Sequence, residues 1–246
     1  MPDHRSYFHH IQSLLDTVLK HESTAIEKAV DMLYDATVNK RNIFVFGASH
    51  AGILSQELTY RAGGMATMNP VHSPGLMLDV KPVTFTSKME RLEGFGTLIA
   101  DKTPIQKDDV IITHSVSGRN TVMIDFVDAA KKRGAKIIAL TNLTYSKEVE
   151  SRHPSGKRLF ELADLVIDNH GDKGDAAMKF EGMDQKVAPT STVVGATIVN
   201  SMVTGLTQKL LDNGKDVPVL YSANLDGGDE HNQKIFEMYK KNIFYL

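Results

Sequence analysis

Short runs of consecutive apolar residues alternate with helical patterns through most of the chain. The apolar runs cover 43–46, 110–113, 137–140 and 165–167. Continuous apolar runs, in contrast to alternating ones, are typical of parallel strands buried on both faces. Apolar residues at helical spacing follow them over about 51–62, 121–133 and 146–162. Strands that alternate with helices predict βαβ units and a parallel sheet.

Helical patterns also flank this alternating region. Apolar residues recur at helical spacing over 8–19 and again over 26–33, and Thr24-Ala25-Ile26-Glu27 matches a capping box. We therefore expect an N-terminal helix pair. Towards the other end, the pattern predicts a long helix over 193–212 and a last helix over 229–242.

Two stretches, 69–96 and 169–189, lack a clear period and are expected to be irregular. Long irregular segments in compact domains are often functional.

Composition narrows the classes of protein to consider. The 246 residues are 41% hydrophobic, which suits one domain with a full core, and no apolar run approaches the roughly 20 residues of a membrane span. The chain has no cysteine, which excludes disulfides, thiolate zinc sites and a cysteine nucleophile. A net charge of -2 gives no electrostatic case for nucleic acid. We expect a cytoplasmic protein with neither a membrane nor nucleic acid as partner.

Two of the expected strands end in small polar residues, at Gly47–Gly52 and at Ser115–Asn120. Ligands bind at the carboxyl ends of the strands in open parallel sheets. In the second segment two hydroxyls, a glycine and an asparagine lead directly into a helix, whose free backbone N–H groups favour an anion. Gly118 lets the backbone approach a ligand closely. The alternative is a plain helix cap by Ser117 or Asn120.

The first segment does not match two better-known motifs. Gly47-Ala48-Ser49-His50-Ala51-Gly52 lacks the glycine that a dinucleotide fingerprint needs where Ser49 stands. It also misses the nucleophile elbow of serine hydrolases by one residue. The sequence therefore favours neither of these classes.

The segment 109–118, followed by a helix and by 134–142, resembles the sugar isomerase (SIS) domain family. In that family an apolar strand leads into a Ser-x-Ser-Gly loop, a helix and a strand that ends in Leu-Thr. The resemblance extends over about 40–210. Glu57-Leu58-Thr59 is further similar to the phosphoheptose isomerase branch, and Asp226–Asn232 resembles a small group of SIS proteins close to it.

The resemblance implies a three-layer αβα sandwich with a five-stranded parallel sheet, of SIS or flavodoxin-like type. We expect one phosphosugar-binding domain over 1–246, with the helix pair in 1–40, the αβα core in 41–222 and a C-terminal helix in 223–246. A phosphorylated sugar is the expected ligand, and a homodimer or homotetramer the expected assembly.

By this resemblance, Ser115, Ser117 and Gly118 hold the phosphate and Ser49 adds a contact. Asn120 stands where the family more often has Ser or Thr, and its amide can still donate. The full set of expected substrate-binding residues is Ser49, His50, Ser115, Ser117, Gly118, Arg119, Asn120, Thr190 and Ser191. Thr190 and Ser191 can equally well only cap the long helix.

Aldose–ketose isomerisation moves a proton between adjacent carbons and needs a base and often an acid. Glu57 matches a glutamate of the phosphoheptose isomerase branch, although a solvated helix carboxylate is the alternative. His231, at the start of the last helix, and His72, beside Ser73-Pro74-Gly75, are the other catalytic candidates, and each can also be a surface histidine. The long helix lacks the histidine that the branch places there, so another residue replaces it, the reaction differs, or the protein only binds.

We expect a sugar-phosphate isomerase that acts through an enediol, with no cofactor and no metal. Asp168, His170, Asp172 and Asp175 lie close in sequence but lack a recognised metal-ligand spacing, which favours a solvated acidic loop. Two alternatives stay open. One is a phosphosugar sensor without turnover, and the other is a lyase or deaminase acting on an amino sugar phosphate.

Overall fold

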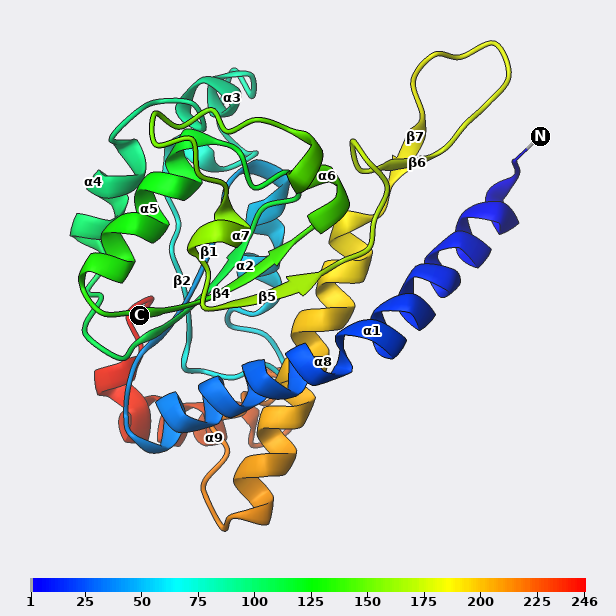
Figure 1. The fold of residues 1–246 in the computed structure, drawn as a ribbon. Helices are drawn as coiled ribbons and strands as arrows, with labels where there is room; N and C mark the ends of the chain where they lie inside the picture. The colour runs from blue at the N-terminus through cyan, green and yellow to red at the C-terminus, as the bar shows by residue number, and fades with distance from the viewer. Residues whose placement is uncertain (1) are drawn as a thin grey trace.

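Figure 1 shows the computed structural model, which describes residues 2–246. Five parallel strands form one sheet in the order β2-β1-β3-β4-β5. The strands are β1 (Ile43–Gly47), β2 (Met68–Pro70), β3 (Val110–His114), β4 (Lys136–Thr141) and β5 (Leu165–Asp168). Helices cover both faces of this sheet, so the structure confirms the expected αβα sandwich with a five-stranded parallel sheet.

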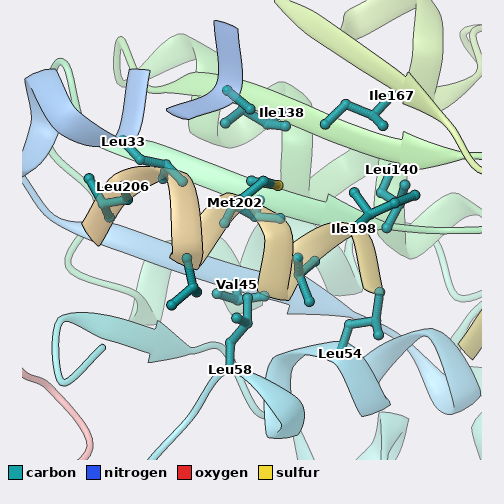
Figure 2. Close-up of a cluster of buried hydrophobic side chains, with 14 of the residues drawn as sticks. Leu33, Val45, Leu54, Leu58, Ile138, Leu140, Ile167, Ile198, Met202 and Leu206 are labelled. Atoms are coloured by element: carbon teal, nitrogen blue, oxygen red, sulfur yellow. The ribbon is translucent and has the colours of Figure 1, made fainter. Parts of the chain in front are cut away.

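Both faces of the sheet are buried, which explains the continuous apolar runs. Ile43 and Val45 of β1 belong to one core, whereas Phe44 and Phe46 belong to the other. The first core is covered by α1 (His4–Val38), α2 (Ile53–Glu57) and α8 (Ser191–Asp212), and Figure 2 shows its side chains between α8 and the strands. The second core is covered by α4 (Phe95–Lys102), α5 (Thr121–Lys132) and α7 (Leu159–Leu162).

The expected N-terminal helix pair was wrong, because α1 is one continuous helix of 35 residues. No glycine or proline interrupts the sequence from His4 to Val38. The hydroxyl of Ser23 bonds to the carbonyl of Leu19 one turn earlier, so the polar residues near the expected break do not start a new helix. The helix begins instead at Asp3, whose carboxylate accepts from the backbone N–H of Ser6 at 3.0 Å.

Two further helix predictions were too long. The stretch 146–162 contains only the end of α6 (Leu143–Glu148) and α7, because Pro154 and Gly156 lie between them and Gly156 has a φ of 71°. The stretch 51–62 contains the end of the 3₁₀ turn η1 (Ser49–Gly52) and the short α2. The predictions for α5 and α8 agree with the structure to within two residues.

The two stretches expected to be irregular contain short elements. The first holds the end of β2, η2 (Pro74–Leu76), α3 (Phe85–Met89) and the start of α4, and the second holds a hairpin of β6 (Ala176–Met178) and β7 (Val187–Pro189). At the C-terminus, α9 (Gly228–Tyr239) and η3 (Lys240–Asn242) lead to a tail packed on the same chain, where Ile235 and Ile243 meet Ala66 and Leu220. No helix within residues 2–246 combines the length and apolar character needed to cross a membrane.

Candidate functional site

The loops after β1 and β3 meet at the point where the strand order reverses direction. β1 pairs with β2 on one side and β3 on the other, and Gly47 at the end of β1 lies opposite His114 at the end of β3. Such a switch point is the usual ligand position in open parallel sheets. A cavity of about 240 Å³ lies there. It is lined by Ala48, Ser49, His50, Ala51, Glu90, His114, Ser115, Val116, Ser117, Asn120, Val122, Met123, Tyr145, Gly174 and Asp175.

The Ser115–Asn120 loop presents donors that the fold does not use. Among residues 2–246, neither the hydroxyl of Ser117 nor the backbone N–H groups of Ser117, Arg119 and Asn120 has a hydrogen-bond acceptor. The hydroxyl of Ser115 accepts from the N–H of Gly118 at 3.2 Å, which holds the loop in its turn. Hydroxyl and amide donors at the start of a helix favour an anion.

Gly118 is required by the shape of this loop. Its φ is 60°, and a Cβ built on it would lie 2.9 Å from the Oγ of Ser146 and 3.2 Å from the Cβ of Leu159. A side chain at this position would therefore be both strained and crowded. Glycine therefore lets the loop pack this closely against α6 and α7.

The first loop adds a hydroxyl and an imidazole to the same cavity. Ser49 has a φ of 55°, an uncommon left-handed conformation for a residue with a side chain. His50 is exposed at the rim, and both residues line the cavity. The structure thus places Ser49, His50, Ser115 and Ser117 around one cavity.

His114 is a buried imidazole at the end of β3, with only 2% of its surface exposed. Its Nδ1 lies 3.1 Å from the carbonyl oxygen of Ala51. Because a carbonyl oxygen only accepts, Nδ1 carries the proton and Nε2 presents a lone pair. Nε2 is buried and has no partner among residues 2–246. Burial lowers the pKa of His114, which keeps the ring neutral and able to accept a hydrogen bond from a ligand.

Glu90 directly follows α3 and lines the cavity. The Nδ2 group of Asn120 donates to the Oε2 atom of Glu90. The backbone carbonyl of Glu90 accepts from the N–H of Val122, at the start of α5, at 3.1 Å. Burial raises the pKa of Glu90, against the opposing effects of Asn120, Arg91, Arg152 and His50. A carboxyl group with a raised pKa exchanges protons closer to neutral pH and suits general acid–base chemistry.

The side chains of Thr190 and Ser191 face a carboxylate of their own chain. Asp175 accepts from the backbone N–H of Ser191 at 2.8 Å and from its hydroxyl at 2.7 Å, and from the N–H of Thr190 at 3.1 Å. Both residues are buried, at 0% and 4% exposure. Asp175 therefore caps α8 and, as a lining residue, brings its own carboxylate to the cavity.

The three predicted catalytic residues do not line this cavity. Glu57 at the end of α2 accepts from the Nδ2 of Asn200 on α8 at 2.9 Å and forms an ion pair with Arg61. His72 is exposed in an adjoining hollow of about 360 Å³, which shares Ser49 with the cavity.

His231 lies on α9, at the far end of the molecule. Its Nε2 is 3.0 Å from the carbonyl oxygen of Val219, and its ring stacks on Tyr221 with 3.6 Å between the centroids. Within one chain, the structure does not bring His231 to the Ser115–Asn120 loop.

The acidic residues that follow β5 are engaged with the protein. His170 pairs with Glu22 at 2.9 Å, and Asp172 pairs with His10 at 2.7 Å and with Lys186 at 2.9 Å. Residues 2–246 contain no group of three or more histidine, aspartate or glutamate side chains placed to hold a metal ion.

Comparison with known proteins identifies the family. The SIS domain model matches residues 6–142. The chain belongs to the SIS domain family. Two UPF0309 proteins resemble this SIS chain over almost its full length. The one from Shouchella clausii is 50% identical over 240 residues, and the one from Oceanobacillus iheyensis is 49% identical over 242 residues; each match covers 98% of both proteins.

Solved structures share the SIS fold at low sequence identity. Phosphoheptose isomerase GmhA from Neisseria gonorrhoeae has a TM-score of 0.56 at 14% identity, covering 83% of this chain and 96% of that one. The Vibrio vulnificus NanR protein complexed with ManNAc-6P has a TM-score of 0.52 at 15% identity, covering 94% of this chain and 68% of that one. These likenesses confirm the fold expected from the resemblance.

Three residues that line this cavity were not among the predicted substrate-binding or catalytic residues: Glu90, His114 and Asp175. Glu90 and Asp175 lie in stretches without a period, and each reaches the cavity through contacts with residues 15 or more positions away. His114 ends an apolar strand, where a polar residue was a usable signal. Its position opposite Gly47, which turns it to the cavity, follows only from the strand order.

Proposed function

We propose that this SIS protein binds a phosphorylated sugar, with the phosphate on the Ser115–Asn120 loop, and interconverts its aldose and ketose forms. The observation that carries the proposal is the set of unpartnered donors in this loop, at the switch point of the sheet, facing an acid–base group at Glu90. The phosphate accepts hydrogen bonds from the Ser117 hydroxyl and the loop amides. The sugar then extends into the cavity towards Glu90 and His114.

The reaction needs two proton movements that these side chains can perform. A base removes the proton from the carbon next to the carbonyl group and leaves an enediol, and the same proton or one from water returns to the former carbonyl carbon. In the proposal Glu90 is this base, since its Oε1 atom has no hydrogen-bond partner among residues 2–246. The Nε2 lone pair of His114 accepts the proton of the neighbouring hydroxyl and returns it to the other oxygen.

The experiment uses phosphorylated five-, six- and seven-carbon aldoses and ketoses beside their unphosphorylated counterparts. Thermal shift selects the best ligand, because binding at about 100 times the dissociation constant adds roughly 2.7 kcal/mol to the stability. Incubation in deuterated water then places deuterium on the carbon next to the carbonyl group if an enediol forms. No stabilisation by any phosphosugar would contradict the proposal.

A matched pair of variants separates the two candidate bases. Glu90→Gln should abolish deuterium exchange with binding largely retained, because the amide keeps the shape and loses the base. Glu57→Gln should exchange like the parent, since Glu57 is held by Arg61 and Asn200 outside the cavity. The reverse result would make Glu57 the base, in line with the phosphoheptose isomerase resemblance.

A second candidate function is binding without turnover. Its support is the likeness to the Vibrio vulnificus NanR protein, which was solved in complex with ManNAc-6P, together with the separation of Glu57 from the cavity. Tight phosphosugar binding with neither deuterium exchange nor any product would favour this function. Release of an amine or an alcohol from an amino sugar phosphate would favour a lyase or deaminase.

We also propose that the chain forms a homodimer or homotetramer. Phe8 and Leu19 on α1 are 67% and 70% exposed, and a second chain packed on this helix would bury them. Sedimentation equilibrium should give a mass of two or four chains, and a single-chain mass would contradict this proposal.

A further inference from the structure

Three arginines are neighbours, in the sequence or through a hydrogen bond, of the contact between Asn120 and Glu90, and these two residues line the cavity. Arg119 precedes Asn120, and Arg91 follows Glu90. Arg152 donates from Nη1 to the Oδ1 of Asn120 at 2.8 Å, and its backbone N–H donates to the carbonyl of Arg119 at 2.9 Å. We refer to Arg91, Arg119 and Arg152 as the arginine cluster.

The arginine cluster has no carboxylate partner within residues 2–246. None of its members lies within 4.0 Å of an acidic side chain, whereas most other arginines of the protein are paired. The paired arginines are Arg5, Arg61, Arg133 and Arg158. The Nε group of Arg119 is buried without a hydrogen-bond partner, although a buried guanidinium donor normally has one.

The buried carboxylate of Asp125 is engaged by other groups. Asp125 accepts from the backbone N–H of Gly94 at 2.7 Å and lies 3.0 Å from the Nε2 of His153, the residue next to Arg152. It forms no ion pair with any of the three arginines. The charge of Glu90 acts on Arg152 without a direct ion pair, and burial raises the pKa of this carboxyl group.

The charges of the cluster act on one another. Burial, followed by the charges of Arg119 and Arg91, lowers the pKa of Arg152. Arg158 shows the opposite behaviour, because its contact with Glu161 raises its pKa. Like charges held together without a counter-ion cost free energy, and a bound anion removes that cost.

We propose that the arginine cluster binds a second anionic group of the ligand, so that the substrate is a phosphosugar that also carries a carboxylate or a second phosphate. This inference rests on the proposed function, in which the first phosphate occupies the Ser115–Asn120 loop. Asn120 belongs to that loop, lines the cavity and bonds to Arg152, so one sugar can bridge the loop and the cluster. Guanidinium groups bind both carboxylates and phosphates through paired hydrogen bonds.

The test compares ligands that differ by one anionic group. Calorimetry measures glucose 6-phosphate against 6-phosphogluconate, and fructose 6-phosphate against fructose 1,6-bisphosphate. The member with the second group should bind at least about 10-fold more tightly in one of the two pairs, because a hydrogen bond to a charged group is lost without it. The pair that shows the gain identifies the second group as a carboxylate or a phosphate.

Variants show whether the gain comes from the cluster. Arg119→Gln should weaken binding of the member with the second anionic group by a larger factor than binding of the monophosphate, and so remove most of the gain. Arg119→Lys keeps the positive charge but loses the paired N–H groups of the guanidinium, so it should keep part of the gain. It replaces Arg119→Gln as the test variant if the glutamine variant does not fold. Arg133→Gln is the control, because Arg133 pairs with Asp101 at the opposite end of α5.

Three outcomes would overturn the inference. Equal affinity within both pairs would show that no second group is recognised. Equal loss of both members of a pair in Arg119→Gln would show that the arginine serves the first phosphate. Monophosphate binding without any gain would leave the proposed function standing alone, whereas failure of every phosphosugar would contradict both.

Discussion

The hydroxyl groups near the cavity differ in whether the fold already uses them. Ser191 donates to Asp175 at 2.7 Å, so its hydroxyl serves the start of α8. Ser115 is engaged by the N–H of Gly118, whereas Ser117 has no partner within residues 2–246. A polar group without a protein partner at a helix start is available to a ligand, and its removal costs the fold little. Ser117 is therefore the residue whose loss should separate binding from stability.

Ser117→Ala should weaken phosphosugar binding by about 1.5–3 kcal/mol, the usual loss of a hydrogen bond to a charged group. Its unfolding midpoint in urea should match that of the parent. Ser201→Ala is the control, because the Ser201 hydroxyl bonds only to the carbonyl of Thr197 on the exposed side of α8, at 2.8 Å. Calorimetry and urea unfolding check both variants. If Ser117→Ala binds the phosphosugar like the parent, the phosphate binds elsewhere.

His114 should make the protein less stable in weak acid. Burial lowers its pKa from the ordinary value of 6.5, so the unfolded chain takes up the proton first as the pH falls. The free energy of unfolding therefore decreases from pH 6.5 down to the folded-state pKa, by at most about 1.4 kcal/mol per pH unit for one group. Above pH 6.5 this contribution is fully present.

Urea unfolding at pH 7.5 and pH 5.5 measures this effect. His114→Gln should lose less stability than the parent between the two values, because the substituted side chain has no proton to gain. His9→Gln should behave like the parent, since His9 is exposed on α1. Equal losses in the parent and His114→Gln would show that the imidazole is not held neutral by the fold.

At the scale of elements, the strands and helices that could be predicted are those with a clear local pattern of apolar residues. The strands β1, β3, β4 and β5 have apolar runs because both of their faces are buried, and α8 has an uninterrupted helical period. β2 was not predicted because it has only three residues, Met68–Pro70. The side-chain amide of its Asn69 donates to the backbone carbonyls of Ile43 and Asn242, which are far away in the sequence.

The residues of the candidate site also differ in whether a local sequence pattern could predict them. The Ser115–Asn120 loop could be predicted because its hydroxyls, glycine and following helix are consecutive in the sequence. The position of Glu90 could not, because its contact with Asn120 joins segments 30 residues apart and no spacing rule describes it. The engagement of Asp175 with Ser191 likewise depends on how the hairpin of β6 and β7 returns to α8.

Helix α4 packs closely on α5, the helix that directly follows the Ser115–Asn120 loop. A Cβ at Gly96 would lie 2.0 Å from the carbonyl oxygen of Val122 and 2.6 Å from the backbone nitrogen of Phe126. These are backbone atoms of α5, so a larger residue has to push the helices apart.

Gly96→Ala should destabilise the protein by about 1–3 kcal/mol, the usual cost of overpacking. The better helix propensity of alanine, worth about 1 kcal/mol, opposes this and does not cancel it. Thr97→Ala is the matched control on an exposed position of α4. Urea unfolding compares the two, and equal stability would show that α4 and α5 separate without cost.

At the scale of the whole molecule, α8 runs from the cavity at its N-terminal end to α9 at its C-terminal end. Its 22 residues correspond to about 33 Å at 1.5 Å per residue. Asp175 and the cavity lie at its N-terminal end, whereas α9 lies beside its C-terminal end (Figure 1). The two ends therefore meet only if a second chain brings its α9 to the cavity of the first.

The contacts of His231 within its own chain predict a structural role for this side chain. Its hydrogen bond to Val219 and its stack on Tyr221 together predict a loss of about 1–3 kcal/mol of stability in His231→Ala. His231→Phe keeps the stack and should recover part of that loss. Phosphosugar affinity and deuterium exchange should equal those of the parent in both variants, measured well below their unfolding midpoints. A loss of exchange by about 100-fold or more in folded His231→Ala would be the size expected for a missing general acid or base. That result would place the ring in the cavity of a neighbouring chain, and exchange should then return in mixed oligomers of His231→Ala with Glu90→Gln.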